Sequence, residues 1–282
     1  MITRLHTEVE LNDWRAKQAN KKIGFVATMG ALHQGHMALV DAAKADCDVV
    51  IASIFVNPAQ FEEAHDLAQY PRTVDTDVAM LEEQNVDAVF IPEASEIYNE
   101  NYKTRVLVDG LTDSLCGATR PGHFDGVATI ITILLNMIRP DVSFFGEKDA
   151  QQLLVLQRLQ KDLRLSGDIQ GVPTARASDG LALSSRNQNL SASQREAAPI
   201  LYKTLCTIKD NIMQGDDIKE AIKWSSNVII EAGFDKIDYL ELRNEQSLEL
   251  IEHSDRLRES ARLFVAARIG KTRLIDNIRI KR

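Results

Sequence analysis

The sequence predicts an α/β fold, in which a doubly wound parallel sheet is followed by a smaller C-terminal α+β domain. Short apolar runs alternate with helical patterns as far as residue 172, which is typical of successive βαβ units. Farther along, the order changes to helices followed by strands, which is typical of an α+β domain. We therefore predict two domains, at residues 1–174 and 175–282.

Five segments of the first domain are predicted to be strands: the first four are short and largely apolar, like strands in a parallel sheet, and the fifth is ended by Pro173. These strands are expected at residues 23–27, 48–56, 86–92, 142–145 and 168–172. Helices are expected before and between them, at residues 8–20, 37–45, 73–84, 126–137 and 150–163. Residues 93–124 show no regular pattern, and a loop of this length in a compact domain is usually functional or mobile.

The second domain begins in a stretch of small and polar residues between residues 175 and 190. Two helices are predicted next, at residues 192–213 and 216–231. Strands are then expected at residues 237–242, 263–268 and 272–280. This order of elements predicts a small α+β unit.

The composition argues against several classes of protein. The chain has 282 residues, of which 44% are hydrophobic and 26% charged, as in ordinary globular proteins. Its formal net charge of −8 argues against general affinity for nucleic acid or for anionic membranes. Cys47, Cys116 and Cys206 are far apart, which fits a reducing compartment. Since no signal-peptide pattern or membrane-spanning run is present, we expect a cytoplasmic protein.

Two glycines and two histidines lie at the first strand-to-helix junction, where Thr28–His36 reads TMGALHQGH. Ligands of open α/β sheets bind at such junctions, and a helix N-terminus favours phosphate. The segment matches neither the P-loop nor the G-x-G-x-x-G pattern. His33 and His36 instead form H-x-G-H, which resembles the signature of the nucleotidylyltransferase superfamily. The alternative is a turn whose histidines cap the helix or face solvent. A zinc pair is disfavoured because no cluster supplies further ligands.

Three further segments carry positive charge near predicted junctions. Lys148, in Gly146–Asp149, can pair with a triphosphate, although a surface lysine beside a capping aspartate is the alternative. Ser184–Asn187 offers two hydroxyls and a guanidinium that can hold β- and γ-phosphates, or it is a polar linker turn. Arg120 and His123 can add positive charge, or they belong to a solvated loop.

Neutral hydrogen-bonding side chains follow the second strand and open a later helix. Asn57 and Gln60 fall at the carboxyl end of the second strand, and Gln152 lies near the start of the helix at 150–163. The two glutamines suit a small hydroxy acid, although a position on the helix surface is the alternative for Gln152.

Acidic residues of the helix at 73–84 are the candidates for placing Mg²⁺, which prefers oxygen ligands and substrate phosphates. They are Asp75, Asp77 and Glu82. We expect them instead to form a solvated helix face, and we assign no residue as a metal ligand.

Six segments together resemble the pantothenate synthetase family, also called the pantoate–β-alanine ligases. They are Thr28–His36 (TMGALHQGH), Ser53–Phe61 (SIFVNPAQF), Tyr70–Thr73 (YPRT), Arg120–Val127 (RPGHFDGV), Phe145–Leu153 (FGEKDAQQL) and Gly171–Asn187 (GVPTARASDGLALSSRN), in the order and spacing of the family. A looser match continues to Arg273–Asn277. The resemblance implies a Rossmann-like catalytic domain that binds ATP and pantoate at residues 1–174, and a lid domain at 175–282.

The resemblance also implies roles for individual residues. The catalytic set is His33, His36, Lys148 and Arg186, with His36 as proton donor. ATP contacts are implied at Met29, Gly30, Ala31, Leu32, His33, Gln34, Gly35, His36, Gly146, Glu147, Lys148, Asp149, Ala175, Leu183, Ser184, Ser185 and Arg186. Substrate contacts are implied at Gln60 for pantoate and β-alanine, at Gln152 for pantoate, and at Asn57, Arg120 and His123.

The reaction that the resemblance implies has two steps. Pantoate attacks the α-phosphorus of ATP to give pantoyl adenylate and pyrophosphate, and β-alanine then displaces AMP to give pantothenate. Mg²⁺ is the implied metal and a homodimer the implied assembly, with no nucleic-acid or membrane partner.

Two alternatives remain: a nucleotidylyltransferase that stops at an adenylated product, and a nucleotide-binding module without catalysis. An RNA-binding role is disfavoured by the acidic charge and the small second domain.

Overall fold

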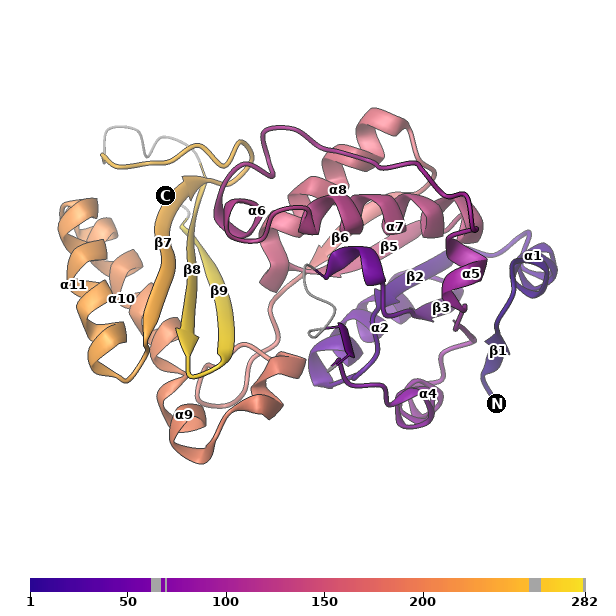
Figure 1. The fold of residues 1–282 in the computed structure, drawn as a ribbon, viewed down its shortest axis with the longest axis horizontal. Coiled ribbons are helices and arrows are strands. Elements are labelled where there is room, and N and C mark those ends of the chain that lie inside the picture. Colours follow the sequence, from indigo (N-terminus) through magenta and orange to yellow (C-terminus); the bar gives the residue numbers. More distant parts are fainter. Residues whose placement is uncertain (62–66, 69, 254–259, 281–282) are drawn as a thin grey trace. The chain divides into compact units, whose positions relative to one another are not determined.

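The structure is a computed structural model that describes residues 1–61, 67–68, 70–253 and 260–280. The chain divides into two compact units (Figure 1). The first comprises Met1–Glu147 and Gln151–Pro173, and the second comprises Lys148–Ala150 and Thr174–Arg282. The sequence does not predict that Lys148–Ala150 groups with the second unit, because these residues directly follow a strand of the first.

A six-stranded parallel sheet forms the centre of the first unit, in the order β1-β4-β3-β2-β5-β6. The strands are β1 (Thr3–Leu5), β2 (Ile23–Thr28), β3 (Val49–Ile54), β4 (Ala88–Phe90), β5 (Val142–Gly146) and β6 (Asp168–Val172). The five predicted strands are confirmed. Strand β1 is not predicted, because three residues with only one buried side chain leave no periodic signal.

The point at which the strand order reverses lies between β2 and β5. From β2 the chain adds β3 and β4 on one side of the sheet, whereas β5 and β6 lie on the other side. Ligands of doubly wound sheets bind outside the carboxyl ends of the strands at this switch point. Thr28 and Gly146 end the two strands that flank it.

Helices cover the sheet of the first unit, so its central strands are buried on both faces (Figure 1). They are α1 (Glu8–Lys17), α2 (Gln34–Asp46), α4 (Val74–Glu83), α5 (Ala94–Ile97), α6 (Leu115–Thr119), α7 (His123–Ile138) and α8 (Ala150–Leu163), with short 3₁₀ turns η1 (Pro58–Gln60) and η2 (Glu147–Asp149). The side chains of Phe25, Ile51 and Phe144 are fully buried in this core. Helices α5 and α6 fall in the segment that the sequence leaves irregular.

The second unit packs helices on a three-stranded antiparallel sheet in the order β7-β8-β9. Its elements are η3 (Ser185–Asn189), α9 (Ala192–Ala197), α10 (Ile200–Gln214), α11 (Ile218–Glu231), β7 (Lys236–Asn244), β8 (Ala261–Ile269) and β9 (Thr272–Ile280). The expectation of one helix over 192–213 is wrong, because Pro199 has no N–H and interrupts the helical ladder between α9 and α10. In the described part of the chain, no helix is long and apolar enough to cross a membrane.

Candidate active site

The loop that leaves β2 has a left-handed backbone conformation at two successive residues. Gly30 has φ +81° and Ala31 has φ 50°. Glycine is favoured at position 30 by this conformation, and a Cβ there would also lie close to Asp77, 3.0 Å from its Oδ2. The Gly30 amide donates to Thr28 Oγ1 at 3.2 Å, and that hydroxyl donates to the Ser53 carbonyl at 2.7 Å. The loop is thereby tied to strand β3.

Asp77 holds the same loop from helix α4. Its carboxylate accepts from the backbone amides of Ala31 at 3.0 Å and Leu32 at 2.8 Å, and from Oγ1 of Thr73 at 3.1 Å. Because Asp77 is 1% exposed, the expectation that it lies on a solvated helix face is wrong. Asp75 lies near the solvent, with its side chain 95% exposed. Among the described residues, no three acidic, histidine or cysteine side chains form a metal-binding group.

His33 and His36 form a capping box at the start of α2. Nδ1 of His33, the N-cap residue, accepts from the amide of Gly35 at 3.0 Å, and Nδ1 of His36 accepts from the amide of His33 at 3.2 Å. Their ring centroids lie 4.1 Å apart. Since Nδ1 accepts in both rings, the proton of each neutral imidazole lies on Nε2. Helix capping therefore sets the tautomer in which Nε2 carries the proton of each ring, beside a helix N-terminus that favours anions.

The other residues of this segment differ in exposure. Ala31 and Leu32 are buried, at 5% and 7% exposed, whereas Gln34 is exposed and Met29 is half-buried. The backbone amides of Ala31 and Leu32 donate to Asp77, so contacts of these two residues with a nucleotide stay a prediction.

Asn57, which lies shortly after β3, is buried, and both polar atoms of its side chain form hydrogen bonds. Its side chain is 1% exposed; Nδ2 donates to the Gly126 carbonyl at 3.1 Å, and Oδ1 accepts from the Tyr98 hydroxyl at 2.7 Å and from the Ala59 amide at 3.3 Å. Asn57 therefore positions the η1 turn, and its contact with substrate stays a prediction. A Cβ on Gly126 would lie 2.2 Å from the Ala59 carbonyl oxygen, so this glycine allows the close approach of α7.

His123 connects Arg120 to the backbone of Gln60. Nη1 of Arg120 lies 2.9 Å from Nε2 of His123, and Nδ1 of His123 lies 3.3 Å from the Gln60 carbonyl oxygen. A guanidinium can only donate, so Nε2 accepts and Nδ1–H donates to the carbonyl. Arg120 and His123 are half-buried, and the structure brings them together with Gln60 rather than leaving them in a solvated loop.

Gln151 is a residue that the sequence analysis misses. Its side chain is buried; Nε2 donates to the carbonyls of Leu111 at 2.9 Å and Ser114 at 2.8 Å, and Oε1 accepts from the Cys116 amide at 2.9 Å. It therefore orders the turn before α6, whereas the adjacent Gln152 is half-buried. Two neighbouring glutamines carry no sequence signal that distinguishes the buried one from the candidate ligand.

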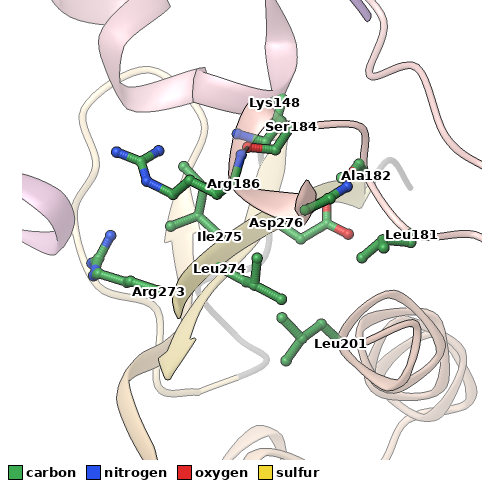
Figure 2. A pocket seen from close by; sticks show the side chains of 11 residues that line it. Lys148, Leu181, Ala182, Ser184, Arg186, Leu201, Arg273, Leu274, Ile275 and Asp276 are labelled. Carbon is green, nitrogen blue, oxygen red and sulfur yellow. Dashed lines mark hydrogen bonds between the residues drawn. The ribbon is translucent and has the colours of Figure 1, made fainter. Parts of the chain in front are cut away.

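The second unit gathers three cationic side chains around one pocket (Figure 2). Lys148 and Arg186 line it with Ser184, as does Arg273, which the sequence analysis includes only in a loose family match. Nε of Arg273 donates to Oδ2 of Asp238 at 2.8 Å, and Nζ of Lys148 lies 3.7 Å from Oδ1 of Asp149. Such a pocket is suited to an anion with several oxygens.

The predicted nucleotide residues between 175 and 186 belong to one loop of the second unit. The Leu183 amide donates to the Ala175 carbonyl at 2.9 Å, so these two residues face each other. Oγ of Ser184 accepts from the Arg186 amide at 3.3 Å and caps η3. The first unit thus brings together the two histidines and, separately, Gln60 with Arg120 and His123, whereas Lys148, Ser184 and Arg186 meet in the second.

Comparisons with known proteins identify the family. A family model described as "Pantoate-beta-alanine ligase" matches residues 3–279. Pantothenate synthetase of Chromohalobacter salexigens is 48% identical over 267 residues, which cover 94% of this chain and 93% of the relative. A crystal structure of pantothenate synthetase from Thermus thermophilus is 42% identical, with a TM-score of 0.92 and complete coverage of both chains.

A second solved structure was determined with ligands. It is the pantoate-beta-alanine ligase of Francisella tularensis, complexed with beta-gamma ATP and beta-alanine. It is 35% identical, has a TM-score of 0.83, and the match covers 99% of this chain and 97% of that chain. On these sequence and structural matches, the chain belongs to the pantoate–β-alanine ligase family of ATP-dependent, amide-forming enzymes.

Proposed function

We propose that the chain condenses pantoate with β-alanine through a pantoyl-adenylate intermediate and releases AMP and pyrophosphate. The observation that carries this proposal is the capping box of His33 and His36, which presents two Nε2–H donors at a helix N-terminus. The ligands named for the Francisella tularensis relative, beta-gamma ATP and beta-alanine, support the same substrates here.

In the first step, a carboxylate oxygen of pantoate attacks the α-phosphorus of ATP, and the bond between that phosphorus and pyrophosphate breaks. Negative charge builds up on the transferring phosphoryl group and on the leaving pyrophosphate. His33 and His36 would donate Nε2–H bonds to these oxygens, and Lys148 and Arg186 would supply positive charge. Catalysis of this kind consists mainly of positioning and charge stabilisation, so no covalent nucleophile is required.

In the second step, the amine of β-alanine attacks the acyl carbon, AMP departs with its oxygen, and the nitrogen loses a proton as the amide forms. Gln60 and Gln152 would hold pantoate through neutral hydrogen bonds. The hydrogen bond from His123 Nδ1 to the Gln60 carbonyl, at 3.3 Å, supports this role because it fixes the backbone of Gln60. Because the acyl adenylate is hydrolysable, the site must exclude water while it waits for the amine.

We assign the first unit as the catalytic domain and the second as a lid, in keeping with the family resemblance. Mg²⁺ would arrive with the phosphates of ATP, which this ion commonly uses as ligands. The carboxylate of Asp77 is occupied by backbone amides, so it does not fit a direct metal ligand, and no step is assigned to the metal.

Location and assembly are further parts of the proposal. The wide separation of Cys47, Cys116 and Cys206 along the sequence supports a reducing, cytoplasmic compartment. The family resemblance supports a homodimer, which light scattering of the purified chain tests directly.

Product analysis with ATP, Mg²⁺, pantoate and β-alanine tests the reaction. We expect pyrophosphate release only when pantoate is present, and pantothenate only when β-alanine is added. A stable adenylated product that does not react with β-alanine would favour a nucleotidylyltransferase. ATP binding without any turnover would favour a nucleotide-binding module.

A further inference from the structure

Asn277 on strand β9 contacts the backbone of Lys148. The side chain of Asn277 is 4% exposed, and its Nδ2 donates to the Lys148 carbonyl at 2.9 Å. Both residues belong to the second unit, although 129 positions separate them in the sequence. The bond therefore fixes the backbone from which the Lys148 side chain extends toward the pocket (Figure 2).

The orientation of the Asn277 amide is set from its other end. Nη1 of Arg262 donates to Oδ1 of Asn277, and because arginine has no acceptor, the oxygen must face Arg262 and the nitrogen Lys148. Arg262 is itself 4% exposed, and its Nη2 donates to Glu245 at 2.8 Å. Burial acts to raise the pKa of Glu245, but Arg262 and Arg279 hold that pKa below its ordinary value. A charged Glu245 thus keeps Arg262 in place.

Asp276, the residue before Asn277, binds Arg176, which begins the turn that leads to Arg186. Asp276 is 4% exposed and accepts two bonds from Arg176, at 2.6 and 2.8 Å. Arg176 also donates to the Gly180 carbonyl at 3.1 Å and lies over the ring of Tyr202. Adjacent residues of one strand therefore contact the Lys148 segment and the turn that leads to Arg186.

We propose that Asn277 is a positioning residue for Lys148, and that strand β9 sets the spacing between the cationic groups that bind the phosphates. This inference rests on the phosphate role proposed above for Lys148. Nothing in it requires Asn277 to touch ATP. The amide acts through the main chain of Lys148, so its removal should affect ATP chemistry rather than pantoate binding.

The substitution Asn277→Asp removes the donor and adds a negative charge, whose general effect the control below measures. Aspartate has the same shape and keeps an acceptor for Arg262, but it cannot donate to the Lys148 carbonyl. We expect the rate of adenylation to fall by up to about 100-fold, as for other small misplacements of reacting groups. Pantoate-dependent exchange of pyrophosphate into ATP measures this rate. The KM for ATP should rise, whereas the KM for pantoate should not change.

Asn244→Asp is the matched control. Oδ1 of Asn244 accepts from the amides of Gln246 at 2.8 Å and Ser247 at 2.9 Å, and aspartate preserves both bonds. This variant should retain the wild-type rate of exchange.

A double-mutant cycle with Lys148→Ala shows whether Asn277 acts through Lys148. If it does, adding Asn277→Asp to Lys148→Ala causes no further loss of exchange. An equal loss in both backgrounds would overturn the proposal and leave Asn277 a purely structural residue.

Hydrogen exchange gives a readout that does not depend on activity. Amides of residues 146–151 should exchange faster in Asn277→Asp, and in Asn277→Ser if the aspartate variant does not fold, than in the wild type or Asn244→Asp. Unchanged exchange in this segment would overturn the positioning role. An inactive wild-type chain would instead refute the proposed function. The hydrogen-exchange experiment would still decide whether Asn277 holds the backbone of Lys148.

Discussion

At His33 and His36, helix capping and the proposed phosphate binding would use different nitrogens of the same ring. Nδ1 of each imidazole accepts a backbone amide, which leaves the proton on Nε2. The alternatives of a helix cap and a phosphate site, which the sequence leaves open, are therefore compatible. A substitution that preserves only the cap can separate the two roles.

Substitution of His33 by serine should preserve stability and abolish most activity. A serine at the N-cap can accept the Gly35 amide, but it lacks a donor at the position of Nε2. We expect adenylation to fall by about 10²–10³-fold, as for the loss of one charge-stabilising donor. His33→Ala should lose the same activity and also about 1 kcal/mol of stability, which thermal or urea unfolding measures. Wild-type adenylation in His33→Ser would contradict the catalytic role.

Asp77 shows that a buried carboxylate can organise a ligand loop without binding the ligand. In Asp77→Asn, the amide nitrogen would face the backbone N–H of Ala31 or Leu32, so one donor would lose its acceptor. We expect the free energy of unfolding to fall by about 1–3 kcal/mol and adenylation to slow. Asp75→Asn, in the same helical turn but with its side chain 95% exposed, is the control and should change neither. Equal stability of the two variants in urea would contradict the assignment.

At the scale of elements, the end of α5 and the start of α7 meet at the turn that carries Gln60. Tyr98, the C-cap of α5, donates to Asn57, and Asn57 donates to Gly126 near the start of α7. Burial raises the pKa of the Tyr98 hydroxyl to about 12 from an ordinary value of 10.0. The folded chain therefore stabilises the protonated phenol of Tyr98 relative to its phenolate.

Tyr98→Phe removes this link while keeping the ring. We expect a loss of about 1 kcal/mol near neutral pH, because Asn57 loses a donor. Since the pKa is raised on folding, the Tyr98 contribution is complete below pH 10 and declines as the pH rises toward 12. The stability difference between wild type and Tyr98→Phe should shrink over that interval in urea titrations. A difference that grows with pH would contradict the direction of the shift.

Elements with a strong apolar pattern are predicted well, and those set by distant contacts are not. Helix α8 has the predicted bounds because its helical periodicity is strong, whereas strand β6 has them because Pro173 follows it. Helix α7 begins at His123, before the predicted residue 126, and the residue before it, Gly122, has a left-handed conformation. The burial of Asp77 and Asn57 depends on loops far along the chain, which helical or strand patterns cannot reveal.

At the scale of the whole molecule, the alternation of helix and strand predicts a doubly wound parallel sheet, but it does not predict the extent of each unit. The sequence predicts a doubly wound sheet, which the structure shows. It gives no sign that Lys148–Ala150 belongs with the second unit. That grouping depends on contacts such as the one from Asn277, whose amide reaches across 129 positions. Composition and local periodicity report on neighbours along the chain, so pairings of this length escape them.

The bond between Asn277 and Lys148 has a consequence for how the chain matures during synthesis. Lys148 is translated 129 residues before the side chain that holds its carbonyl. At ribosomal rates of about 5–20 residues per second, that interval lasts roughly 6–26 s, and Asn277 must then clear the exit tunnel. A nascent polypeptide that has already folded its parallel sheet still lacks this contact. A ribosome that stalls before β9 would therefore leave Lys148 without its anchor.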